Sequence, residues 1–147
     1  MNKNNYLIAL SESEHTDFGR VEFANQSEAQ KVFSAIWALE SQVNNGGFLQ
    51  YFISSDGDTA NFAPSALRRI GAQTCAGVVE RALRTASPSP LPISQDAREK
   101  LMDSLSDSDR EQLEAIDSDF FAYPDNLTDL LFAYVMSNPD TFGPVTK

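Results

Sequence analysis

Histidine and cysteine, on which many catalytic and metal sites depend, are almost missing from this sequence. Its 147 residues include one histidine, His15, and one cysteine, Cys75. Catalytic triads and imidazole-based zinc sites both need histidine, and His15 stands in the polar acidic segment SESEHTD. Cys75 can form neither an internal disulfide nor a multi-cysteine zinc site, and it begins an apolar stripe typical of a buried cysteine. We therefore expect a protein that is not an enzyme and that uses no metal or other cofactor.

Long hydrophobic runs are missing as well. The apolar run near the N-terminus covers only Tyr6 to Leu10, which is too short for the hydrophobic region of a signal peptide. No stretch approaches the length that a membrane-spanning helix needs. The single cysteine gives no sign of an oxidising compartment. These absences predict a cytoplasmic protein that is neither secreted nor inserted into a membrane.

Basic residues are scarce. Lysine and arginine number 11 against 21 aspartates and glutamates, which gives a formal net charge of −10. Residues 96–147 hold twelve of the acids and four of the bases, so this third of the chain carries most of the excess. Such a charge disfavours contact with nucleic acid or anionic lipid and predicts that a charge-steered partner is basic. An acidic surface that only keeps the protein in solution is the alternative interpretation.

Composition otherwise predicts one ordinary globular domain over residues 1–147. Apolar residues make up 41% and charged residues 22%, and a chain of this length buries a core without disulfides. Residues 1–24 are ambiguous, because YLIAL and GRVEF fit a short strand-like segment as well as a helix edge. The proline-rich stretch SPSPLP, residues 87–92, cannot be helical and predicts a stiff connector.

Helical periodicity begins at Ser27. Ser27 and Gln30 have the spacing of a capping box, which predicts the start of a helix. The residues that recur at helical spacing after it are Val32, Phe33, Ile36, Trp37, Glu40 and Val43. We expect Trp37 to lie in the core and the helix to end at about Val43, because two asparagines and two glycines follow.

Further helices follow from the same reasoning. Phe48, Tyr51 and Phe52 share one face of a short helix that should end at the SSDGD turn. Pro64 fits only a first helical turn, so the next helix should begin near Asn61 or Phe62 and end at Gly71. Residues 73–85 carry a clean apolar stripe, which predicts a helix there.

The chain after residue 95 predicts three more helices. Leu101, Met102 and Leu105 mark the first, and a second capping box, Ser108 with Glu111, predicts the start of the next. The last is marked by Leu127, Leu130, Leu131, Tyr134 and Val135 and should end before Pro139. The predicted fold class is therefore all-α, an irregular bundle of about seven helices.

Acidic residues gather on one face of the helix that follows the second capping box. Residues three and four apart on a helix are neighbours, and like charges at that spacing repel by a few tenths of a kcal/mol. A helix that keeps such a row presents regular negative charge, as a nucleic acid backbone does. The candidate partner-binding residues are Asp103, Asp107, Glu111, Glu114, Asp117 and Asp125.

The stretch AIWALESQVNNGGFLQYF, followed by SSDGD, ALRRIGA and VVERAL, resembles the bacterial DNA-mimic protein family typed by DNA mimic protein nineteen. The later segment AIDSDFFAYPDNLTDLLFAYV fits the same pattern, and most members of the family are described only as a domain of unknown function. The resemblance implies an all-helical acidic protein that binds a helix-turn-helix transcription regulator where DNA would bind. It leaves open whether the chain forms a homodimer.

The residues that carry the resemblance are expected to be structural. They are Asn44, Asn45, Gly46, Gly47, Phe48, Gln50, Tyr51 and Phe52. Two alternatives to DNA mimicry stay open. A polar site around Asn45, Gln50 and Tyr51 would bind a small ligand, and an immunity-like inhibitor of a basic toxin would use the same acidic surface as a DNA mimic.

Overall fold

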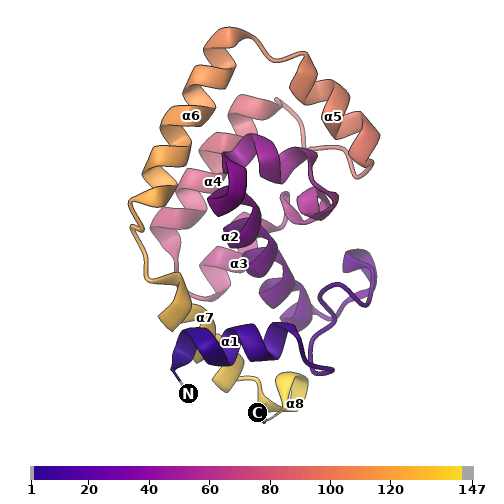
Figure 1. The fold of residues 1–147 in the computed structure, drawn as a ribbon, viewed down its shortest axis with the longest axis vertical. Helices are drawn as coiled ribbons and strands as arrows, with labels where there is room; N and C mark the ends of the chain where they lie inside the picture. The colour runs from indigo at the N-terminus through magenta and orange to yellow at the C-terminus, as the bar shows by residue number, and fades with distance from the viewer. Residues whose placement is uncertain (1, 144–147) are drawn as a thin grey trace.

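The computed structural model describes residues 2–143, which form eight α-helices and two short 3-10 helices and contain no strand (Figure 1). The helices are α1 (Lys3–Ser11), η1 (Phe23–Asn25), α2 (Glu28–Ile53), η2 (Ser55–Thr59), α3 (Ala63–Arg69), α4 (Gln73–Ala86), α5 (Gln95–Asp103), α6 (Asp107–Phe121), α7 (Leu127–Met136) and α8 (Pro139–Phe142). The predicted all-α fold class is confirmed.

Of the two structures that the sequence left open for residues 1–24, YLIAL forms a helix and not a strand, because it lies inside α1. The side chain of Asn2 caps this helix by accepting the backbone N–H of Asn5 at 2.7 Å. Leu7 and Leu10, three residues apart, are buried on one side of it. A cap and a short apolar face are therefore enough to make α1 helical.

Helix α2 is the central element and contacts α3, α5, α6 and α7. It begins as predicted, with the Ser27 hydroxyl accepting the Gln30 N–H. Non-helical backbone angles at Gly46 and Gly47 divide it into two segments, which agrees with the predicted stop and aromatic restart. Trp37 was expected in the core but is only partly buried, and it stacks on the fully buried Phe33 with the ring centroids 5.4 Å apart.

Helices α3 and α4 form a layer against α2 and α6. Pro64 stands in the first turn of α3, and α4 covers the predicted range with its apolar stripe buried. The buried side chains of α4 include Cys75, Val78, Val79 and Ala82. Local periodicity therefore predicted both helices correctly.

The N-cap of α6 lies two residues before the predicted one at Ser108. Helix α6 is capped by Ser106, whose hydroxyl accepts the Asp109 N–H at 3.0 Å. Both serines are followed three residues later by an acid. The earlier start places Asp107 and Asp109 in the first turn, where carboxylates are stabilised by the helix dipole.

Arg98 attaches the proline-rich connector to the end of α2. Its side chain is fully buried although it is charged. The guanidinium donates to the backbone carbonyls of Phe52, Ser54, Pro92 and Ile93. The connector is thus held against the body of the molecule by hydrogen bonds.

The C-terminal part of the described chain ends in α8, a four-residue helix that the sequence did not predict. It follows α7 directly, and Phe142 is fully buried beside Phe33. Among residues 2–143, no helix combines the length and the apolar character needed to cross a membrane.

Candidate partner-binding surface

Three acidic residues point outward from α6. Asp107, Glu111 and Glu114 are exposed, whereas Leu113, Ile116 and Phe120 on the opposite side of the helix are buried. Helix α6 runs along the outer edge of the molecule, so its outward face is not covered by another described element (Figure 1). We call Asp107, Glu111 and Glu114 the acidic row.

The acidic row has no basic partner. The ion pairs of residues 2–143 involve none of its members. Arg110, which stands between them in sequence, directs its guanidinium to the Met102 carbonyl at 2.7 Å. Within residues 2–143, no salt bridge compensates these three charges.

The linear charge density of the acidic row is comparable to that of one nucleic acid strand. A helix rises about 1.5 Å per residue, so the two intervals between Asp107, Glu111 and Glu114 average roughly 5 Å of helix axis per charge, against about 3.4 Å per phosphate of one DNA strand. Asp103, exposed at the C-terminal end of α5, lies across the short turn from the start of the row. The acidic surface therefore continues from the end of α5 along α6.

Asp117, which was predicted as part of this surface, turns inward instead. Its carboxylate accepts the backbone N–H of Phe48 at 2.8 Å. The side chain is partly buried, and desolvation raises the pKa of the Asp117 carboxyl although the Phe48 N–H opposes the shift. Asp117 thus caps the second segment of α2.

Asp125 is engaged in the same kind of contact. Its carboxylate accepts the backbone N–H of Cys75 at 2.8 Å, in the first turn of α4. The N-cap position of α4 is Ala72, whose side chain cannot accept a hydrogen bond. Asp125 therefore supplies the missing cap from the loop between α6 and α7.

The glycine corner joins the two segments of α2. Gly47 has φ +79° and ψ −175°, a backbone conformation that residues other than glycine rarely adopt. A Cβ atom there would overlap the carboxylate of Asp117. Beyond the corner, Phe48, Tyr51 and Phe52 are fully buried, and Phe48 packs edge-on against Phe120 of α6. The two glycines and the aromatic residues of the motif have structural contacts in this fold.

The polar residues proposed for a small-ligand site are not joined to one another by any hydrogen bond in the described chain. The Tyr51 hydroxyl is buried and lies 2.6 Å from Thr59 Oγ1, and desolvation raises the pKa of Tyr51. The Gln50 amide donates to the Gln42 side chain, and the Asn45 side chain is exposed. These contacts give no support to a ligand site built from these three residues.

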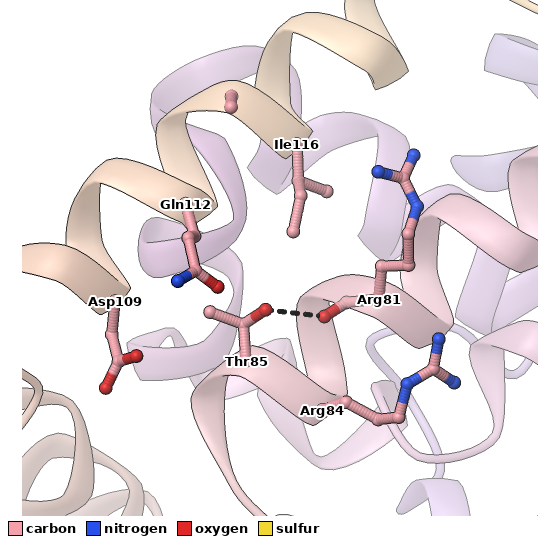
Figure 2. Close-up of a pocket in the computed structure, with 7 residues that line it drawn as sticks. Arg81, Arg84, Thr85, Asp109, Gln112 and Ile116 are labelled. Atoms are coloured by element: carbon pink, nitrogen blue, oxygen red, sulfur yellow. Dashed lines mark hydrogen bonds between the residues drawn. The ribbon is translucent and has the colours of Figure 1, made fainter.

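An open groove with a volume of about 500 Å³ lies on the other side of α6, against α4. Figure 2 shows Asp109, Gln112 and Ile116 of α6 across from Arg81, Arg84 and Thr85 of α4. Arg81 pairs with Asp119 at 2.9 Å. Arg81 and Arg84 lie on the polar side of α4. They face the groove, on the side of α6 opposite the acidic row.

The remaining candidate groups are placed as follows. The Cys75 thiol is buried, and burial raises its pKa to about 12, so the thiolate does not form near neutral pH. His15 lies close to Gly143, and its carbonyl accepts a hydrogen bond from Gln30. Residues 2–143 contain no group of three or more acidic, histidine or cysteine side chains arranged to hold a metal ion.

Comparison with known proteins agrees with the resemblance seen in the sequence. A family model described as DMP19-like protein matches residues 24–138, which include both the glycine corner and all of α6. Neither the curated proteins nor the solved structures gave a match. Because the family model covers most of the chain, this protein belongs to the DMP19-like protein family.

Proposed function

We propose that this protein is a DNA mimic, a non-enzymatic acidic protein that occupies the DNA-binding surface of a basic protein such as a helix-turn-helix transcription regulator. The observation that carries the proposal is the acidic row, whose three exposed carboxylates have no basic partner in the described chain. Family membership supports it, as does the formal net charge of −10.

The physical reason is electrostatic complementarity. A surface that binds DNA carries lysine and arginine spaced to meet phosphates, and a rigid row of carboxylates presents charge of the same sign at a comparable density. Helix α6 keeps that row rigid because its opposite face is anchored by Leu113, Ile116 and Phe120. Association steered by such a row is fast and falls steeply with added salt.

A triple charge reversal tests the proposal. Asp107→Lys, Glu111→Lys and Glu114→Lys together should abolish capture of the basic partner from a native lysate, whereas the unmodified chain should capture it and release it at high salt. Lysine in the first turn of α6 loses a dipole interaction worth about 0.3–1 kcal/mol, so a melting curve is recorded first to show that the variant folds.

A matched control separates local from global charge. Glu12, Glu14 and Glu22 are exposed and lie outside α6, so replacing all three by lysine changes the net charge by the same amount. This control should keep its partner. Equal binding by the α6 variant, or equal loss in both variants, would contradict the assignment of the surface.

DNA competition separates mimicry from the second candidate, an inhibitor of a basic toxin. The same acidic row serves both, so mutation alone does not distinguish them. The captured protein is mixed with its own duplex target, and a mimic should be displaced as DNA is added. A partner that binds this chain and DNA at the same time would favour the inhibitor.

A further inference from the structure

A small cavity lies beside the first segment of α2, where α1 and α7 pack together. Its volume is about 150 Å³. Polar and aromatic side chains from three helices line it: Asn4 of α1, Thr128 of α7, and Trp37, Glu40, Ser41 and Asn44 of α2. The four α2 residues recur at helical spacing, so one face of that helix forms the wall of the cavity. No residue of the acidic row takes part.

Glu40 is the only charged residue in this lining. Its side chain is partly buried and forms no hydrogen bond or ion pair with any residue in the range 2–143. Removing a carboxylate from water without a partner is unfavourable. Glu40 therefore directs an unmatched carboxyl group toward the cavity.

The lining indicates the chemistry of an occupant. A carboxylate calls for a positive charge, and the oxygens of Asn4, Ser41 and Thr128 can accept further N–H groups. Trp37 adds an aromatic surface, which attracts organic cations, and Phe33 covers one face of its ring. A divalent metal ion would need several oxygen ligands with more negative charge than one carboxylate provides.

Size limits the occupant further. A water molecule takes up about 30 Å³ in the liquid, so the cavity has room for roughly five waters or a molecule of similar size. A short alkylamine fits within this volume, whereas a nucleotide or a peptide would extend beyond it into the solvent.

We propose that this cavity binds a small organic ammonium ion, with the Glu40 carboxylate as its counter-ion and the Trp37 ring against its alkyl part. This site is separate from the acidic row, so the failure of one proposal leaves the other standing.

Binding should be linked to pH. Burial raises the pKa of Glu40 from 4.5 to about 7, so the free protein holds a proton there in mildly acidic solution. An ammonium ion needs the ionised form, and its affinity should fall about tenfold per pH unit below pH 7. The Glu40 charge contributes to the raised pKa of the buried Cys75 thiol, which stays neutral near pH 7. Lys3 and Asp129 adjoin the lining residues Asn4 and Thr128 in sequence and pair with each other at 3.3 Å.

Trp37 is the only tryptophan of the chain, so its fluorescence reports on the cavity directly. The full chain is titrated at pH 8 with propylammonium and with 1-propanol, a neutral molecule of the same size. Propylammonium should change the Trp37 emission in a saturable way, and the alcohol should bind at least about tenfold more weakly. Backbone amide shifts at Ser41 and Thr128, followed by NMR, locate the response.

Two variants complete the test. Glu40→Gln keeps the shape of the side chain and should weaken propylammonium binding by at least about tenfold. Glu14→Gln removes an exposed carboxylate from the loop after α1 and should bind as the unmodified chain does. Equal binding by Glu40→Gln, equal binding of the alcohol, or no response to propylammonium would each overturn the proposal.

The pH profile of the unmodified chain gives a check that needs no variant. Between pH 8 and pH 5 its affinity for propylammonium should fall by about 100-fold if Glu40 supplies the charge. An affinity that is constant over this range would also overturn the assignment.

Discussion

The carboxylate of Asp117 in α6 accepts the backbone N–H of Phe48 in α2 at 2.8 Å, across 69 residues of sequence. The contact fills the space beside Gly47 that a side chain at that position would need. It also satisfies an N–H at the start of the second α2 segment, which has no partner within its own helix. One hydrogen bond therefore links the glycine corner to the helix that carries the acidic row.

Replacing Gly47 by alanine should destabilise the protein by at least about 2 kcal/mol. The residue would be forced into a backbone region that costs about 1–3 kcal/mol for residues other than glycine, and its methyl group would displace Asp117. Urea unfolding followed by circular dichroism measures the change in the free energy of unfolding.

Gly77 provides the control for that measurement. It lies inside α4 with open space around its Cβ position, so Gly77→Ala should stabilise the protein by about 0.5–1 kcal/mol. A Gly47→Ala variant as stable as the unmodified chain would show that the corner does not need this conformation.

The acids of the C-terminal region should divide into two classes by their effect on stability. Asp117→Ala and Asp125→Ala should each lower the free energy of unfolding by about 1 kcal/mol, because each removes a helix cap. Glu114→Ala should change it by less than about 0.5 kcal/mol, because Glu114 is exposed and unpaired. Thermal melts of the three variants under one set of conditions test this division, and equal effects would contradict it.

Glu40→Gln should stabilise the protein in a pH-dependent manner. The folded-state pKa of Glu40 is about 7 against 4.5 for the unperturbed group, so the native state binds the extra proton between these values. The stability of the unmodified chain therefore falls, through this group, as the pH rises from 4.5 to 7. Because the carboxyl keeps some contact with water, the total loss is up to about 3 kcal/mol.

The measurement is the difference in unfolding free energy between Glu40→Gln and the unmodified chain. It should be near zero at pH 4.5, rise toward pH 7 and then level off. Glu14→Gln, at an exposed site, should show no such rise. A difference that does not vary with pH would mean that Glu40 titrates as it does in water.

Local signals predicted the parts of the fold that local interactions determine. The Ser27 cap, the break at Gly46 and Gly47, the first-turn position of Pro64 and the stripe of α4 each depend on residues within one or two turns. The predicted start of α6 was two residues too late because Ser106 and Ser108 are each followed three residues later by an acid. The sequence pattern does not show which of the two serines caps the helix.

The roles of single polar residues could not be predicted in this way. Asp117, Asp125 and Arg98 each bind a backbone group that is 44 to 69 residues away, and the local sequence does not distinguish such residues from exposed charges. Glu40 did leave a signal, since it is an acid in the inward register of α2. The position of Glu40 in α2 did not predict the cavity, because the residues from α1 and α7 that line it are distant in sequence.

The residues on the inner side of α6 pack against the rest of the protein, whereas those on its outer side are exposed. A mutation at Asp117 removes a hydrogen bond to the glycine corner. Mutations at Asp107, Glu111 and Glu114 break no ion pair within residues 2–143. During evolution the outward residues can therefore be exchanged without loss of the fold. If the acidic row is the partner-binding surface, as we propose, relatives that share the glycine corner are free to diverge at these positions and so in the partner they recognise.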